Sequence, residues 1–261
     1  MKLKGTGRII FWPGGSLWMG TAQGGSELHA HHAIQIAFGI ETPICLRTEA
    51  PGGWTDYFGV IIGPDVAHEY RAAGGLVANL FLEPESRLGR RLLDRFGGAV
   101  SPLDPQSARS MLAPLVRLFA EDAGDEALMQ ETMQIFGDLA GLAPPSRPTD
   151  PRILRIIDWI YAHIDEPLTL GAAAGLACLS ESRLRHLFVA ETGVAFRPFV
   201  LWARAKRAVE IGFGGVSWTE AAMGANFADQ AHLTRTCRRM FGLVPSALSP
   251  GSAAALRTAQ D

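Results

Sequence analysis

The sequence has little of what membrane-spanning and disulfide-rich proteins need. Its three cysteines, Cys45, Cys178 and Cys237, form no CxxC pair, so we expect reduced thiols that occupy small buried apolar positions. The longest uncharged run, residues 9–26, contains a proline and five glycines, which excludes a membrane helix of about 20 apolar residues. No uninterrupted apolar segment follows the first two lysines, so we expect a cytoplasmic protein without a membrane partner.

Neither sign of charge dominates, but the charges are unevenly distributed. The chain has 24 Lys and Arg against 26 Asp and Glu, a net charge of −2. Residues 1–149 carry 12 basic and 16 acidic side chains, whereas residues 180–240 carry nine basic and five acidic ones. Because a polyanion responds to local charge, the near-neutral total does not exclude nucleic acid as a partner.

Prolines divide the chain. Four of them fall within residues 143–151, and no periodic pattern crosses this stretch, so we interpret 143–150 as a linker. We therefore expect one domain over residues 1–142, a second over 151–249, and a tail over 250–261.

The first domain contains two kinds of sequence pattern, one typical of strands and one typical of helices. Short apolar runs at 33–40, 60–62 and 76–82 are separated by Gly-Gly pairs, a pattern typical of a small β-sandwich or barrel. Leucines, methionines and phenylalanines then recur at three- and four-residue spacing in three segments, 85–96, 106–120 and 126–139, which predicts helices. These helices either cover the β-structure or form the contacts of a homodimer.

The second domain is predicted to be helical almost throughout. Isoleucines at 153, 156, 157, 160 and 164 form one stripe of an amphipathic helix, with Asp150 as its cap and Pro151 at its first position. A small-residue helix over 170–177, a short turn, and a helix that begins at Ser180 and ends at Gly193 form a helix-turn-helix pattern.

The same pattern occurs a second time, after a long helix over about 197–211. A short helix over 218–225 is followed by a turn and a helix over 230–241, with Asp229 as cap and Gly242 as its terminating glycine. The two candidate recognition helices begin 49 residues apart, at Ser180 and Asp229. A rigid helix between them would let one chain reach two successive major grooves, about 34 Å apart.

Residues from about 150 to 249 resemble the DNA-binding domain of the AraC/XylS family of bacterial transcription regulators. The most specific stretch, residues 224–248, reads GANFADQAHLTRTCRRMFGLVPSAL. The first unit matches through Leu168-Thr-Leu, Ser180, Leu184, Leu187-Phe188, Glu191-Thr-Gly193 and Arg204. Cys237 stands where the family usually has phenylalanine, and Ala247-Leu248 replaces the usual aromatic-Arg pair. The resemblance implies sequence-specific binding to double-stranded DNA.

All but one of the predicted DNA-binding residues lie opposite the apolar stripes of the two recognition helices; the exception, Arg204, lies on the long helix between them. In the first helix Leu184, Leu187 and Phe188 should be buried, and in the second Leu233, Cys237 and Met240. An exposed arginine can bond to guanine O6 and N7 through two N–H groups in the major groove, and the remaining polar side chains can contact base edges or phosphates. The predicted DNA-binding residues are Ser182, Arg183, Arg185, His186, Arg204, Gln230, Ala231, His232, Thr234, Arg235, Arg238 and Arg239.

Histidines in the first domain resemble a weakened cupin site. His29 and His31 form an HxH motif, and His68 follows a Pro-containing turn some 36 residues later, an arrangement that gathers imidazoles inside a small β-barrel. Imidazoles suit Zn, Fe, Ni or Cu, but Gln35 replaces the carboxylate that completes a cupin metal site, so we expect no metal cofactor. A small-molecule pocket is the favoured interpretation, and a metal site or purely structural histidines are the alternatives. The expected pocket residues are Trp18, His29, His31, Gln35, Trp54 and His68.

We therefore expect an α+β protein with an N-terminal cupin-like β-barrel, packing helices and an all-α domain with two helix-turn-helix units. The predicted function is sequence-specific transcription regulation, modulated by an unknown small-molecule effector in the barrel, with RNA polymerase as a partner if the protein is an activator. One alternative is a metal-dependent cupin enzyme with a helical adapter domain. Another is an architectural DNA-binding protein that has no effector.

Overall fold

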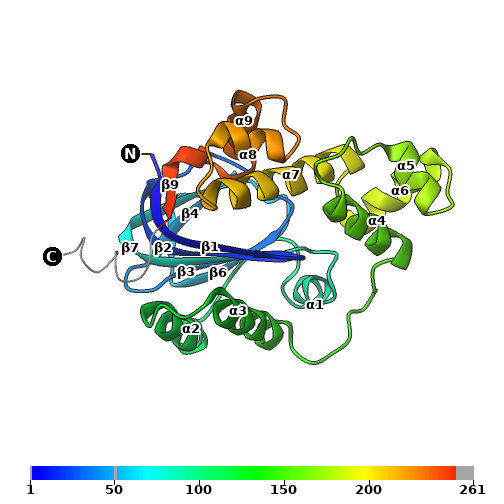
Figure 1. Ribbon diagram of the computed structural model, residues 1–261. Coiled ribbons are helices and arrows are strands. Elements are labelled where there is room, and N and C mark those ends of the chain that lie inside the picture. The colour runs from blue at the N-terminus through cyan, green and yellow to red at the C-terminus, as the bar shows by residue number, and fades with distance from the viewer. Residues whose placement is uncertain (1, 50–51, 251–261) are drawn as a thin grey trace.

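The computed structural model describes residues 2–49 and 52–250. Its N-terminal half is a strongly curved sheet with helices on two sides (Figure 1). The strands are β1 (Lys4–Trp12), β2 (Gly15–Gly25), β3 (Ile34–Gly39), β4 (Ile44–Thr48), β5 (Thr55–Tyr57), β6 (Gly59–Ile62), β7 (His68–Leu82), β8 (Val100–Pro102) and β9 (Leu248–Pro250). Their order is β8-β6-β3-β7-β2-β1-β9, and β4, which also pairs with β5, joins the first part of β7.

The long strand β7 organises this sheet because it pairs with β2, β3 and β4. Side chains along a strand point alternately to its two faces. Leu80 therefore packs with the core beneath the helices, whereas Phe81 belongs to a second cluster that includes Trp202 and Phe241 from the C-terminal half.

Helices α1 (Arg87–Phe96), α2 (Pro105–Ala120) and α3 (Asp125–Ala140) match the three helical segments expected for the first domain. α2 and α3 cover one side of the sheet (Figure 1). Their buried side chains, which include Leu115, Phe119 and Phe136, lie in one cluster with Ile36 and Leu80 of the sheet. The apolar faces of these helices are therefore occupied within the chain, and the predicted homodimer needs some other surface.

The C-terminal half consists of the six predicted helices. They are α4 (Pro151–Ala162), α5 (Leu170–Leu176), α6 (Glu181–Thr192), α7 (Phe196–Phe213), α8 (Trp218–Gly224) and α9 (Gln230–Phe241), followed by a single 3₁₀ turn (Pro245–Ala247). Side chains of Asp150, Ser180 and Asp229 accept hydrogen bonds from the first turns of α4, α6 and α9. Gly193 and Gly242 end α6 and α9 in left-handed conformations. The capping residues expected from the sequence are therefore confirmed.

Helix α7 separates the two helix-turn-helix units. The group α4 to α6 lies beyond one end of the sheet, whereas α8 and α9 lie over the side opposite α2 and α3 (Figure 1). The chain then returns to the sheet, since β9 pairs in parallel with β1. The end of the helical half thus adds an edge strand to the N-terminal sheet.

The α+β class and the two helix-turn-helix units are as predicted, with some local corrections. Strands β1 and β2 were not anticipated, and the HxH motif lies in the connection between β2 and β3, where His29 forms only an isolated bridge with His68. Burial was expected for all three cysteines and is found for Cys237, but Cys178, in a left-handed position after α5, is exposed. Cys45 is half-buried and its thiol donates to Asp56.

Among the described residues, no helix is long and apolar enough to cross a membrane. Of the predicted tail, residues 251–261 lie outside the described part of the chain, and Pro250 belongs to β9.

Candidate functional site

Helix α6 presents a polar face opposite its buried stripe. Leu184 and Phe188 are completely buried and Leu187 is half-buried. The predicted DNA-binding residues Ser182, Arg183, Arg185 and His186 are all exposed. This face is therefore open to a ligand, with two guanidinium groups within its first five residues.

Helix α9 has the same arrangement. Leu233, Cys237 and Met240 are buried as expected. On the other side of the helix, the candidates Gln230, Ala231, Arg235, Arg238 and Arg239 are exposed and Thr234 is half-exposed. Two of the five arginines on the two faces, Arg185 and Arg235, lie near the middle of their helices.

Three candidates make contacts within the chain. Arg204 is half-buried, and its guanidinium donates to the backbone carbonyls of Ile164 and Glu166 at 3.3 and 2.8 Å. The His232 ring packs edge-on against Phe227 at 5.1 Å. The Gln230 side-chain oxygen accepts a hydrogen bond of 2.9 Å from Thr219. Arg204 thus holds the connection after α4, which makes it a poor candidate for a DNA contact.

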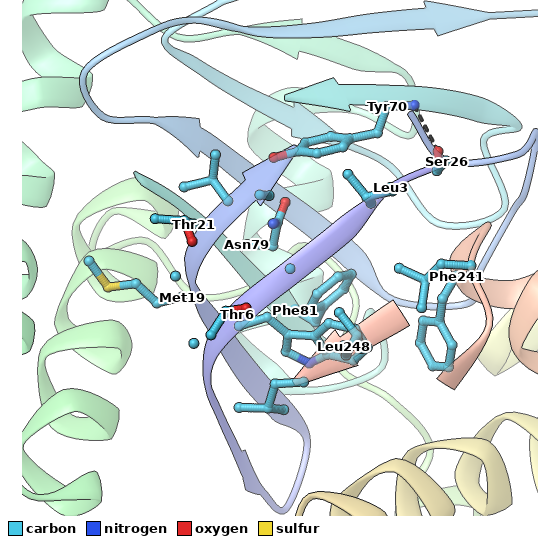
Figure 2. A pocket seen from close by; sticks show the side chains of 18 of the residues that line it. Leu3, Thr6, Met19, Thr21, Ser26, Tyr70, Asn79, Phe81, Phe241 and Leu248 are labelled. Carbon is cyan, nitrogen blue, oxygen red and sulfur yellow. Dashed lines mark hydrogen bonds between the residues drawn. The ribbon is translucent and has the colours of Figure 1, made fainter. Parts of the chain in front are cut away.

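A cavity lies between the sheet and the C-terminal half, with a volume of about 100 Å³. One buried water occupies only about 10–15 Å³ on this measure, so a small organic molecule can fit. Trp18, Phe81 and Asn79 line the cavity from β2 and β7. Phe241 and Leu248 line it from α9 and β9, and Figure 2 shows these two side chains together with Asn79 and Phe81. Its wall is predominantly apolar with a few polar groups, which is the usual character of a small-molecule site.

Four of the six predicted pocket residues line this cavity: Trp18, His29, His31 and Gln35. His68 lies outside the lining but is completely buried, with its ring centre 4.2 Å from that of His29. Trp54 was misplaced. Its ring lies against the guanidinium groups of Arg47 and Arg71, at 5.1 and 3.8 Å, so it is a cation–π partner on a different part of the sheet.

Several residues that line the cavity were not predicted from the sequence. Asn79 shares the period-two alternation of β7 with Phe81, so the strand pattern could have found it. Phe213, Phe241 and Leu248 belong to the helical half, and no local pattern signals that these residues meet the sheet.

The three histidines are uncharged at neutral pH. Burial, followed by the neighbouring His68 and His31, lowers the pKa of His29 from 6.5 to about 2. Burial and His68 lower the pKa of His31 to about 4, and burial also lowers the pKa of His68. Neutral imidazoles can accept hydrogen bonds or bind metal ions.

Buried polar contacts join the two halves of the chain. The ammonium group of Lys206 on α7 pairs with Glu83, which directly follows β7, and lies 2.7 Å from the Tyr161 hydroxyl on α4. Burial raises the pKa of Glu83, but Lys206 and Tyr161 outweigh burial, so this pKa lies below its usual value. Arg90 of α1 donates to the carboxylate and the backbone carbonyl of Glu191 on α6.

The end of α9 is also fixed to the sheet domain. The backbone N–H of Glu27 donates to the Gly242 carbonyl at 2.8 Å, and that of Ala30 donates to the Arg239 carbonyl at 3.4 Å. The Phe241 ring packs against Trp18 at 5.2 Å. The second recognition helix is thus held by the segment that carries His29 and His31.

Comparisons with known proteins agree with this arrangement. Residues 173–249 match a helix-turn-helix domain family. Among solved structures, apo ToxT K231A from Vibrio cholerae strain SCE256 has a TM-score of 0.61 and 10% identity, with 92% of this chain and 97% of that one covered. ToxT from Vibrio cholerae O395 has a TM-score of 0.58 and 12% identity, with 89% and 95% covered.

The wild-type ToxT of strain SCE256, solved with an unsaturated fatty acid bound, has a TM-score of 0.54 and 10% identity over 91% of this chain and 94% of that chain. At these identities the likeness shows the fold alone. No curated protein matches the sequence. The chain thus carries a C-terminal helix-turn-helix domain of the AraC type, within a fold that is similar to that of ToxT over nearly its whole length.

Proposed function

We propose that the chain reads an asymmetric DNA site with α6 and α9, and that a small molecule in the interdomain cavity modulates this binding. The candidate base readers are Arg185 on α6 and Arg235 on α9, because each is exposed opposite a buried stripe and arginine can bond to guanine through two N–H groups. Arg238 and Arg239 lie at the end of α9, where they suit phosphate contacts.

The cavity carries the effector half of the proposal, because both halves of the chain line it. Phe241 and Leu248 come from the elements that end the DNA-binding half, and Trp18 and Phe81 come from the sheet. A ligand in this position contacts both surfaces at once. Its binding free energy therefore depends on how α9 and β9 sit against the sheet.

Such a ligand would act by shifting the population of domain arrangements. It changes DNA affinity only to the extent that it binds one arrangement better than another. The Lys206–Glu83–Tyr161 cluster and the bonds from residues 27 and 30 to the end of α9 favour the arrangement described here. A ligand that wedges Phe241 away from Trp18 would disfavour this arrangement, and one that fills the cavity without displacement would stabilise it.

The first experiment is selection of bound sequences from a random duplex pool with the full chain, followed by footprinting. Two protected blocks one helical turn apart are expected. A single block would show that only one unit reads bases, and the absence of enrichment with and without candidate effectors would refute specific DNA binding.

The effector is then sought by measuring affinity for the selected site in the presence of small apolar and amphipathic molecules. An unsaturated fatty acid belongs in this panel because one ToxT structure contains it. Any active compound is tested again with Trp18→Ala and Trp54→Ala. The first substitution should abolish the response, whereas the second, at a residue that does not line the cavity, should leave it intact. Equal responses of the two variants would place the effector elsewhere.

We also propose that the chain forms a homodimer and, if it is an activator, contacts RNA polymerase. The selected DNA site allows both proposals to be tested. If two chains bind together, the footprint will contain two copies of the site. If the protein is an activator, transcription from a promoter with the selected site will rise when the protein is present.

A further inference from the structure

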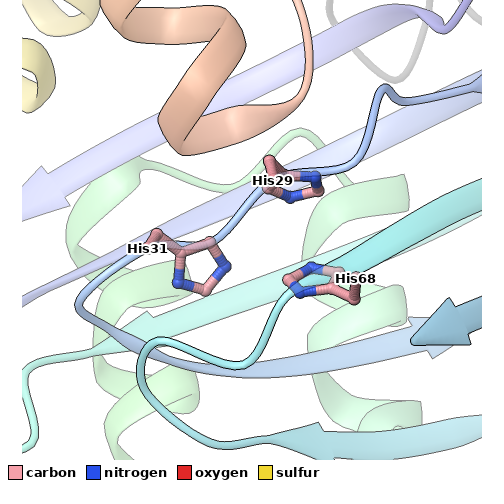
Figure 3. Close-up of side chains that lie close together, drawn as sticks. All are labelled: His29, His31 and His68. Carbon is pink, nitrogen blue, oxygen red and sulfur yellow. The ribbon is translucent and has the colours of Figure 1, made fainter. Parts of the chain in front are cut away.

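We infer that His29, His31 and His68 form a binding site for a divalent transition-metal ion, with the side-chain oxygen of Gln35 as a fourth ligand. All three imidazoles are buried, and one nitrogen from each lies within 4.8 Å of the others. The rings come from two segments, the connection between β2 and β3 and the start of β7, and they lie around a common space (Figure 3). This reverses the expectation of a metal-free pocket that Gln35 suggested.

The hydrogen bonds of the three rings fix the same tautomer. Each Nδ1 lies close to the backbone carbonyl of a residue two positions away, at 2.9 Å for His29, 2.9 Å for His31 and 2.8 Å for His68. A carbonyl oxygen only accepts hydrogen bonds, so each Nδ1 carries a proton and donates it. In a neutral ring this leaves a lone pair on Nε2. Metal-binding histidines are held in this manner, with the other ring nitrogen donating to a carbonyl or carboxylate.

One of these lone pairs has no partner. His68 Nε2 is buried and makes no hydrogen bond to any described residue. A buried acceptor without a partner costs free energy, and a bound water or ion is one of the explanations for such a group in a native structure. His29 and His31 are the side chains next to it, with ring centres 4.2 and 5.4 Å away.

The contact between His31 and Gln35 also points to a cation. His31 Nε2 lies 3.0 Å from Gln35 Oε1, and the Gln35 amide nitrogen donates to Asn79 at 2.9 Å. With its proton on Nδ1, His31 therefore directs a lone pair at an oxygen that is itself an acceptor. A second proton on His31 would instead create a buried imidazolium beside two other histidines, which is costly. In this orientation of the Gln35 amide, a metal ion bound to both atoms removes the conflict, since ligands about 2.1 Å from one ion at a right angle are about 3.0 Å apart. Turning the Gln35 and Asn79 amides together would remove the conflict without an ion, so this contact supports the site only together with the unpartnered His68 nitrogen.

The donor set decides the class of ion. Three imidazole nitrogens and one amide oxygen suit Zn²⁺, Ni²⁺, Cu²⁺ or Fe²⁺ rather than Mg²⁺ or Ca²⁺, which prefer all-oxygen sites. In a tetrahedral zinc site the ligand nitrogens lie about 3.4 Å apart, so small movements of the rings would bring them to bonding distance. His29, His31 and Gln35 also line the cavity, which leaves room for a ligand atom of an effector on the ion.

An ion at this position would affect DNA binding through the end of α9, and this part of the inference rests on the proposed function. His29 lies between Glu27 and Ala30, whose N–H groups bind the carbonyls at the end of α9. An ion that joins His29 to His68 would hold this segment, and with it the end of the second recognition helix, against the sheet.

The test uses tag-free full-length protein, stripped with a chelator and titrated with Zn²⁺ in competition with a chromophoric chelator. About one ion per chain is expected, and Co²⁺ should give the visible absorption of a site with nitrogen ligands and low coordination number. His31→Gln and His68→Gln should each weaken binding by at least about ten- to a hundredfold, the loss typical of changes even around a metal site. Gln35→Glu, which supplies the missing carboxylate, should tighten it.

His163→Gln is the matched control. The Nδ1 of His163 also lies close to a backbone carbonyl, that of Trp159 at 2.9 Å, but the residue lies on the helical half away from the cluster, so binding should be unchanged. The inference is overturned if folded wild-type protein binds neither Zn²⁺ nor Co²⁺ at micromolar concentration. It is also overturned if His68→Gln and His163→Gln bind equally. Because these readouts need no DNA, a negative result leaves the proposed DNA and effector binding untouched.

Discussion

Replacement of Lys206 by methionine should greatly weaken the attachment of the helical half to the sheet. The two charged side chains of the Lys206–Glu83 pair are only 11% and 5% exposed. Removal of one partner of a buried ion pair leaves the other charge unpaired and typically costs about 3–5 kcal/mol. We therefore expect Lys206→Met to lower the free energy of unfolding by about this amount, and Glu83→Gln to have a similar effect.

The assay is urea unfolding of the two single variants and the double variant Glu83→Gln/Lys206→Met. Because the partners touch, the loss in the double variant should be smaller than the sum of the two single losses by about 1–3 kcal/mol. Arg207→Met is the matched control on the same helix. Arg207 pairs with Glu210 at 47% and 44% exposure, so its loss should cost less than about 1 kcal/mol. Equal effects of Lys206→Met and Arg207→Met, or strictly additive losses, would refute the reasoning.

The same pair predicts a pH dependence. The folded-state pKa of Glu83 lies below its usual value, so the pair contributes its full stabilisation above the unfolded-state pKa of about 4.3. This contribution is lost as the pH falls through the lower pKa of the folded state. The stability difference between the wild type and Glu83→Gln should therefore shrink toward zero in acid and stay constant from pH 6 to 8.

Three further predictions concern the DNA-binding half. Arg185→Ala and Arg235→Ala should each cost about 1–3 kcal/mol of binding free energy at the selected DNA site in a binding titration. The control Arg87→Ala, on the exposed side of α1, should leave the affinity unchanged. Equal losses of affinity on random DNA would show that the two arginines contact phosphates only. The logarithm of the association constant should fall with the logarithm of the salt concentration at about −0.9 per phosphate neutralised, and a flat dependence would exclude DNA binding of this kind. Gly242→Ala should destabilise the protein more than Gly193→Ala in urea unfolding. Both glycines have positive φ, but a Cβ on Gly242 would lie 2.5 Å from the Glu27 carbonyl oxygen, whereas one on Gly193 meets nothing within 4 Å. Equal losses of stability would show that the end of α9 does not dock on the sheet.

The sequence by itself determined the helices and their ends. Asp150, Ser180 and Asp229 could be recognised as caps, and Gly193 and Gly242 as helix ends, because capping depends on residues within one turn. The buried stripes of α6 and α9 followed from helical periodicity, and this left Arg185 and Arg235 on the exposed faces. These features are local, so a single sequence suffices to find them.

Only the tertiary structure decided which of these elements meet. It joined β9 to β1, Lys206 to Glu83 and the end of α9 to the segment after β2. It also placed Trp54 beside Arg71 rather than in the cavity, and bound the Arg204 guanidinium to backbone carbonyls. These contacts join residues far apart in the chain, or depend on the direction of one side chain. No periodic pattern encodes them, because they result from how the whole sheet and the whole of α7 pack against each other.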